Sequence, residues 1–147
     1  MLDAGPLGDA CRRRGNPDVE RLRGWLVELM ANGVIVAIPG IADHEVRRGL
    51  ILAGSTEGIG RLDELREELG FYIPISIEAM RRAAELWADA RRRGVVTDDD
   101  KEIDADVILA AQAMSLTGLT DRLTVATYNE RHLARYVDAH HWRDISP

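Results

Sequence analysis

The length and composition of the chain predict one globular domain over residues 1–147. With 46% hydrophobic and 30% charged residues it has enough apolar side chains for a core, and no run approaches the roughly 20 apolar residues of a membrane span. The formal net charge of −6 argues against a protein that coats nucleic acid by bulk electrostatics, although short arginine runs are compatible with local phosphate contacts.

The cysteine content and the opening residues indicate a reducing compartment. Cys11 is the single cysteine of the sequence and cannot form an internal disulfide. No signal-peptide pattern opens the chain. We therefore expect a cytoplasmic protein without membrane attachment.

Helix and strand signals alternate through the first half of the chain. The first two residues read as the end of a short strand that would leave Asp3 at its carboxyl edge. A helix capped by an Asn-Pro pair is predicted over 17–32, and a fully apolar strand over 34–38. Two further helices are predicted over 41–53 and 59–69.

The alternation continues in the second half. A strand is predicted over 71–75, where Pro74 limits it to an edge or ends it early. Ser76 caps a long helix that ends at Gly94. A polar connection follows at 94–103, and its acidic residues are expected to be solvated.

The stretch 104–117 is the most apolar part of the sequence, so a helix there would be buried on nearly all sides. Asp104 is predicted as its N-cap and Asp106 in its first turn, where unpaired N–H groups and the helix dipole favour carboxylates. Capping explains Asp106 less well, because a second carboxylate at a buried edge is costly without a partner. A strand at 123–126 and a short helix at 130–137 follow.

This order of elements predicts an α/β fold with a mainly parallel sheet and helices on both faces. Ligands of such sheets bind at the carboxyl ends of the strands. Asp3, Asp106 and Asn129 fall at that rim, and Glu45 lies just beyond it. Asp43 does not share a helix face with Glu45 and is predicted to be exposed.

Carboxylates that meet at one rim repel each other unless shared protons, arginines or a divalent metal offset the charge. Hard oxygen ligands at an accessible rim suit Mg²⁺ or Mn²⁺, which can activate water and stabilise charge on a phosphate. The sequence has no nucleophile elbow, P-loop or dinucleotide fingerprint. The spacing of Asp3, Glu45 and Asp106 in the sequence does not by itself predict that their side chains meet. That prediction depends on the resemblance to a known family.

Four stretches, in order, resemble the motifs of PIN-domain nucleases, particularly the VapC-like toxins of type II toxin–antitoxin modules. They are LDAGPL, IPGIADHEVRRGL, DADVILAAQA and LTVATYN, and the resemblance covers most of the chain. It implies a PIN-like three-layer α/β/α fold with a mainly parallel central sheet of four to five strands. Its acidic cluster would be Asp3, Glu45 and Asp106 around Mg²⁺ or Mn²⁺.

The resemblance also implies supporting residues. Asn129 would be a neutral fourth member of the site that orients water or substrate, and Thr127 would hydrogen-bond Asp3 or the metal shell. Asp104 is either a helix cap or an outer metal ligand. The chain departs from most relatives in its short first strand and in Asn129, which leaves the site less negative than one with four carboxylates.

The implied function is a metal-dependent endoribonuclease that cuts single-stranded or loop RNA, with tRNA and other structured RNAs among the possible substrates. A cognate antitoxin and a homodimer are the implied partners. The alternative is a non-catalytic PIN-fold module that binds protein or RNA, which Asn129 and the short first strand favour slightly. A third alternative is a metal-dependent phosphatase of another α/β type. The sequence does not contain the phosphorylated-aspartate motif that is usual in such enzymes.

Overall fold

The structure is a computed structural model that describes residues 1–13, 15–94, 100–120 and 122–146. Helices dominate it, and the strands are short. In chain order the elements are α1 (Ala4–Ala10), α2 (Pro17–Ala31), β1 (Ala37–Pro39), α3 (Gly40–Leu52), α4 (Thr56–Leu69), β2 (Phe71–Ile73), α5 (Ile77–Arg92), α6 (Asp100–Met114), β3 (Val125–Thr127), α7 (Glu130–Leu133), β4 (Ala139–His141) and the 3₁₀ helix η1 (Trp142–Asp144).

The strands form two small parallel sheets rather than one continuous sheet. Strand β1 pairs with β2, and β3 pairs with β4. The parallel direction is confirmed, but the expected central sheet of four to five strands is reduced to these two pairs. Pro39, which ends β1, carries no N–H that could extend the β1–β2 ladder.

The first three residues join the two sheets. The Leu2 N–H donates to the Ala37 carbonyl at 3.0 Å, and the Asp3 N–H donates to the Ala126 carbonyl at 3.0 Å. The Ala126 N–H in turn donates to the Met1 carbonyl at 2.9 Å. The opening segment therefore lies between β1 and β3, and Asp3 stands at its carboxyl end, as the sequence predicted.

Both faces of this centre are apolar. Leu2 and Ala126 belong to one buried cluster, with side chains of α1, α2 and α4. Their chain neighbours Met1 and Val125 belong to another, with side chains of α6 and α7. Successive strand residues point to opposite faces, so this alternation shows that helices cover the strands on two sides.

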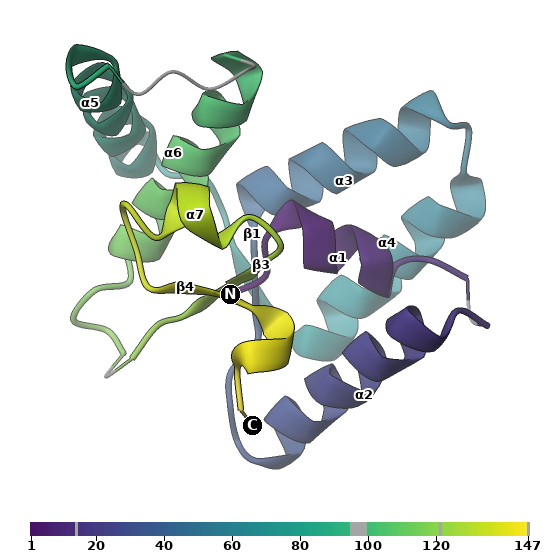
Figure 1. Cartoon of the computed structure of the whole chain (residues 1–147). Helices are drawn as coiled ribbons and strands as arrows, with labels where there is room; N and C mark the ends of the chain where they lie inside the picture. Colours follow the sequence, from purple (N-terminus) through teal and green to yellow (C-terminus); the bar gives the residue numbers. More distant parts are fainter. Residues whose placement is uncertain (14, 95–99, 121, 147) are drawn as a thin grey trace.

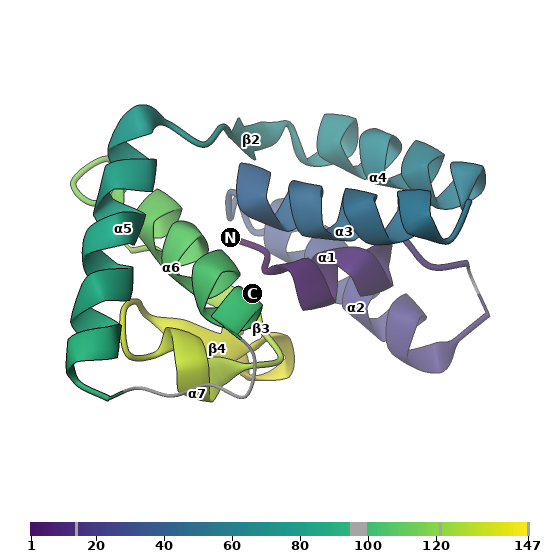
Figure 2. The same cartoon turned by 90° about the horizontal axis from the view of Figure 1, so that it is seen from above.

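Figures 1 and 2 show the same division in space. Helices α1, α2, α3 and α4 gather on one side, and α5, α6 and α7 on the other, with the N-terminus and strands β1 and β3 between them. Helix α3 packs against α1 and α4, and it also contacts α6 across the middle. These contacts bring together the elements that carry the four sequence motifs.

Helix α6 begins earlier than the sequence suggested. It starts at Asp100, so Asp104 is an exposed residue within the helix and not its N-cap, and Asp106 lies beyond the first turn. A first turn that contains lysine and glutamate can propagate a helix, and acidic residues near its N-terminus favour it further. Residues 95–99 of the expected polar connection lie outside the described residues.

A buried glutamine ties α6 to the other half of the fold. Gln112, the polar residue of the apolar run, accepts a hydrogen bond from the Ile41 N–H at 3.1 Å and donates one to the Ile73 carbonyl at 2.7 Å. Its side chain is fully buried. Gln112 therefore fixes the start of α3 and the end of β2 against α6.

Helix α1 was not expected, β1 begins at Ala37 and not at residue 34, and β3 covers Val125–Thr127 in place of 123–126. The boundaries around α5 agree with the sequence. Ser76 caps α5 by accepting from the Ala79 N–H at 3.0 Å, and β2 ends just before Pro74. The tail differs, because it forms β4 and η1, and α7 ends at Leu133. Among the helices of the described residues, none is long and apolar enough to cross a membrane.

Candidate active site

Asp3 is the centre of the candidate site. It ends the joining segment and begins α1, where one carboxylate oxygen accepts from the Ala4 N–H at 2.6 Å. The other accepts from the Thr127 hydroxyl at 2.7 Å. Burial raises the pKa of the Asp3 carboxyl, and these two hydrogen bonds oppose that rise. The site thus holds a carboxylate with little water to stabilise its charge.

Thr127 connects Asp3 with the fourth motif. Its side chain is fully buried at the end of β3, and its hydroxyl oxygen accepts from the Asn129 N–H at 2.8 Å. The hydrogen bond expected between Thr127 and Asp3 is therefore present. Because Thr127 receives one bond and gives the other, it fixes the direction of the Asp3 carboxylate. The Asn129 side chain is exposed beside this pair.

Glu45 enters the site from α3. Its half-buried carboxylate accepts from the Arg48 guanidinium at 3.1 Å. Burial raises the pKa of Glu45, Arg48 opposes that rise, and the neighbouring Asp3 carboxylate adds to it. Glu45 is therefore a second carboxylate whose charged form is disfavoured by burial.

Asp106 lies on α6, where it has a partner that the sequence analysis did not identify. Its carboxylate lies 3.6 Å from Nδ1 of His132 on α7. Helix α6 also contacts α3, which carries Glu45. The position of His132, three residues after Asn129, was the available sequence signal for this Asp106–His132 pair. A single histidine on a short helix did not indicate an acidic partner.

The described residues do not form a ready-made metal cage. Among them, no three His, Cys, Asp or Glu side chains are close enough together to hold one ion. Asp3 and Glu45 nevertheless fit Mg²⁺ in chemistry, because this ion commonly uses one or two carboxylates and completes its shell with water and substrate phosphates. The convergence of Asp106 with these two acids remains a prediction.

Asp43 is buried, contrary to the expectation of an exposed side chain. It is 8% exposed, and its carboxylate accepts from the Arg47 guanidinium at 2.9 Å. Arg47 also donates to Asp63 of α4 at 2.7 Å. The i, i+4 spacing of Asp43 and Arg47 allows this bond on one helix. The pair joins α3 to α4 and so supports the helix that carries Glu45.

An open groove of about 820 Å³ is lined by residues of α1, α3 and α4, among them Glu45. Its lining includes Arg12, Arg13, Arg48 and Tyr128. The groove therefore combines acidic side chains, cationic side chains and one aromatic ring.

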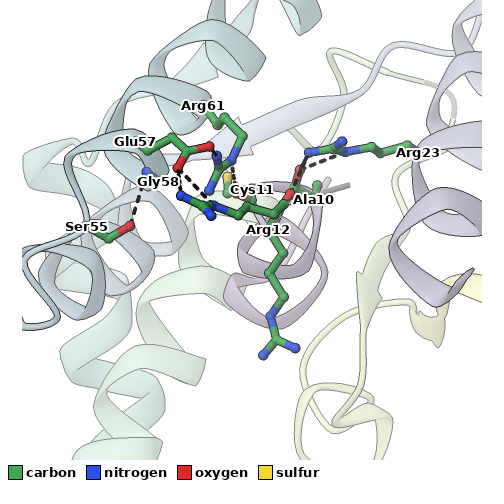
Figure 3. A network of polar contacts seen from close by, with 9 residues as sticks. Ala10, Cys11, Arg12, Arg23, Ser55, Glu57, Gly58 and Arg61 are labelled. Atoms are coloured by element: carbon green, nitrogen blue, oxygen red, sulfur yellow. Dashed lines mark hydrogen bonds and ion pairs between the residues drawn. The ribbon is translucent and has the colours of Figure 1, made fainter. Parts of the chain in front are cut away.

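The arginines around the end of this groove also hold α1 to α2 and α4. Figure 3 shows Arg61 reaching the Cys11 carbonyl, and Arg23 reaching the Ala10 carbonyl, to which it donates at 2.8 and 3.1 Å. Glu57 of α4 binds Arg61 as well. These contacts fix the C-terminal end of α1 and hence one wall of the groove.

Replacing Glu45 by glutamine should stabilise the metal-free protein at neutral pH. The raised pKa means that the native state binds this proton more tightly than the unfolded chain does, so stability falls as pH rises through the ordinary value of 4.5 toward the raised one. Glutamine carries no such charge. At pH values above this range, the variant should unfold in EDTA at a midpoint temperature a few degrees higher than that of the wild type, since 1 kcal/mol corresponds to about 2–4 °C. An equal or lower midpoint at pH 7 would contradict the desolvation of Glu45.

The architecture is that of a defined class of fold. Short parallel strands lie between two groups of helices, and Asp3 and Thr127 stand at the carboxyl ends of the central segments. This is the arrangement that the four motifs indicate for a PIN-type fold.

The comparisons with known proteins support that class. No family model matches the sequence, and no curated protein matches it. The chain is similar to one in the crystal structure of VapBC2 from Rickettsia felis bound to a DNA fragment from its promoter, with a TM-score of 0.73 and 19% identity over 97% of both chains. It is also similar to one in FitAcB from Neisseria gonorrhoeae, with a TM-score of 0.68 and 23% identity over 98% of both. The resemblance to PIN-domain, VapC-like chains is therefore confirmed for the fold.

Proposed function

We propose that this protein is a metal-dependent endoribonuclease and the toxin of a toxin–antitoxin pair. The observation that carries the proposal is the Asp3 carboxylate, which the Ala4 N–H and the Thr127 hydroxyl hold at the carboxyl edge of a PIN-type fold, with Glu45 on the adjacent helix α3. A desolvated pair of like charges is unfavourable without a counter-ion. A divalent metal supplies that counter-ion.

In this proposal Asp3, Glu45 and Asp106 hold Mg²⁺ or Mn²⁺, and Asp104 is an outer ligand at most, since it is exposed on α6. The metal, when bound, supplies an activated water and neutralises charge on the phosphate. Thr127 keeps the Asp3 carboxylate in position through its 2.7 Å hydrogen bond. Asn129 orients water or substrate from the rim.

The groove beside Glu45 is the proposed path of the RNA. Its arginines offer cations for phosphates without making the whole surface basic, which agrees with the net charge of −6. Single-stranded or loop RNA, including tRNA loops, is the proposed substrate. Cleavage then depends on local phosphate contacts and should weaken steeply with salt.

The proposed partners follow from the same resemblance to VapC-like toxins. We propose a cognate antitoxin that covers the site, a homodimer and a cytoplasmic location. The similar VapBC2 structure is a complex bound to a fragment of its promoter DNA. This similarity supports a search for a protein partner of the present chain. A co-purification from the native host tests this part independently of cleavage.

The direct test of the proposed function is RNA cleavage by the purified protein with Mg²⁺ or Mn²⁺. Asp106→Asn should abolish cleavage, because it removes a carboxylate from the proposed metal shell while keeping the shape of the side chain. Calorimetric titration with Mn²⁺ should show weaker binding to the variant. Wild-type cleavage by Asp106→Asn would contradict the assigned role of this residue.

The alternative function is a PIN-fold module that binds RNA or protein without turnover. The replacement of an acid by Asn129 and the absence of a three-residue metal cluster among the described residues favour it. Mn²⁺ discriminates between the two functions. A non-catalytic module should neither bind the ion nor gain thermal stability from it, whereas the nuclease should do both.

A further inference from the structure

Tyr128 is an exposed aromatic residue between two residues of the candidate site, Thr127 and Asn129. Its side chain is 46% exposed, although it lies directly after a buried strand. It lines the groove that contains Glu45. Single exposed aromatic side chains are common, so the inference rests on the place of Tyr128 in this groove and on how its ring is held.

The ring is held in place on several sides. A Cβ atom at Gly5 would lie 2.7 Å from Cδ2 of Tyr128, so the ring rests on α1 where a glycine leaves room. The centroids of the Tyr128 and His141 rings are 5.4 Å apart. Trp142 stacks on His141 with a centroid distance of 5.9 Å. Trp142 in turn lies 5.6 Å from Trp25 in the core. The exposed ring is thus the outer end of a row of aromatic rings.

The hydroxyl group fixes the ring as well. It donates a hydrogen bond to the Asp9 carboxylate at 2.8 Å. Burial and the Asp9 carboxylate raise the pKa of Tyr128 to about 12, so the side chain stays neutral at physiological pH. A neutral, immobilised ring can approach a polyanion without repelling it and loses little conformational entropy on contact.

Cations lie along the same groove. Arg12, Arg13 and Arg48 are exposed, and each is engaged in an ion pair at the surface, with Asp9, Glu57 and Glu45 respectively. The Arg12 and Arg48 side chains are exposed although their partners Asp9 and Glu45 are partly buried, and in the Arg13–Glu57 pair both side chains are exposed. An exposed pair contributes little to stability, so a phosphate can compete for these arginines at the smallest cost at Arg13. The groove therefore offers a flat apolar ring together with phosphate-binding groups.

We propose that Tyr128 is a stacking platform for an unpaired base of single-stranded RNA at the entrance to the carboxylate site. The inference rests on the proposed function, because it takes RNA as the substrate. Aromatic side chains bind bases that have left a helical stack, whereas the bases of a duplex are already stacked on each other. Tyr128 accordingly determines specificity for unpaired over paired RNA and positions the neighbouring phosphate near Asp3 and Glu45.

The test uses the full chain in EDTA, where metal-dependent cleavage is blocked, and a short single-stranded RNA that contains 2-aminopurine. Stacking on Tyr128 should quench the fluorescent base in the wild type. Tyr128→Ala should weaken binding about tenfold, within the range of base–aromatic stacking, and lose the quenching. Tyr128→Phe keeps the ring and should retain both. Binding of duplex RNA should change little in any variant.

Two further variants separate stacking from folding. Tyr128→Leu fills much of the space over Gly5 without a π face. It should fold and should lose RNA affinity and quenching, and it replaces the alanine variant as the test if that variant fails to fold. Phe71→Ala is the matched control, because Phe71 is 53% exposed on β2 and does not line the groove. It should bind RNA like the wild type.

The outcomes distinguish this inference from the proposed function. If the wild type binds and cleaves RNA but Tyr128→Leu shows the same affinity and quenching, the stacking role is wrong and the nuclease remains. If the wild type binds no RNA at all, the proposed function fails and this inference fails with it. A uniform loss for single-stranded and duplex RNA would also overturn it, since stacking on an unpaired base cannot explain that result.

Discussion

Asp3→Asn is expected to lower metal-dependent RNA cleavage by about a hundredfold or more, because a bound metal contributes several kcal/mol of charge stabilisation and each ~1.4 kcal/mol is a factor of ten in rate. Asp3 is the acid that both the opening segment and Thr127 orient. An asparagine keeps the shape of the side chain but removes the charge that would bind the ion. The measurement is kcat/KM on single-stranded RNA over a range of Mn²⁺ concentrations.

The same substitution should leave the fold intact. The asparagine carbonyl can still accept from the Ala4 N–H, and the Thr127 hydroxyl can rotate to accept from the new amide. Because burial raises the pKa of Asp3, the native carboxylate is unfavourable above its ordinary pKa of 3.8, and stability falls as pH rises through the raised value. The metal-free variant should therefore be at least as stable as the wild type at pH 7.

A matched acid controls for the loss of one charge. Asp18 is an exposed residue of α2 that pairs with Arg21 and Arg143 at the surface. Asp18→Asn should cleave RNA at the wild-type rate. Cleavage by Asp3→Asn within a few-fold of the wild type, with normal metal dependence, would remove Asp3 from the proposed site.

Local signals in the sequence were sufficient for most helices and for the direction of the strands. The helix at α2 begins after an Asn-Pro pair, and Ser76 caps α5, because capping and proline effects act within a few residues. Parallel pairing followed from the alternation of helix and strand. Continuity of the sheet could not be derived in this way, since Leu2 pairs with residues 35 and 124 positions away.

The candidate site divides along the same line. Motif resemblance indicated Asp3, Glu45 and Thr127. The structure joins Asp3 to Thr127 by a hydrogen bond, and the place of Glu45 in the same site stays a prediction. Contacts between distant elements were not visible in the sequence. The Asp106–His132 pair and the burial of Asp43 depend on how α6 meets α7 and how α3 meets α4, which no local pattern encodes.

Helix α6 begins four residues before Asp104. An N-cap at Asp104 was predicted because aspartate often caps an apolar helix, but the residues before it are also good helix formers. Propensity and capping competed, and propagation of the helix prevailed. Asp104 therefore became an exposed helical residue, and this weakens its case as a metal ligand relative to Asp106.

Gln112→Leu is expected to be the most destabilising single substitution among those considered, at about 2–4 kcal/mol, because it orphans two buried backbone groups at roughly 1–3 kcal/mol each. These groups are the Ile41 N–H and the Ile73 carbonyl. Leucine fills a similar volume, so packing alone would predict little change. Thermal unfolding should show a midpoint lower by roughly 5–15 °C, from about 2–4 °C per kcal/mol.

Gln112→Glu is the variant that separates hydrogen bonding from packing. A protonated glutamate can accept from Ile41 and donate to Ile73, whereas an ionised one can only accept. Full burial should raise its pKa in the native state, so stability should approach the wild type below the ordinary value of about 4.3 and fall as pH rises above it. A leucine variant as stable as the wild type, or a glutamate variant without this pH dependence, would show that Gln112 does not hold α6 against α3. Because α3 carries Glu45 and α6 carries Asp106, losing this tie should also weaken Mn²⁺ binding at temperatures where the variants remain folded.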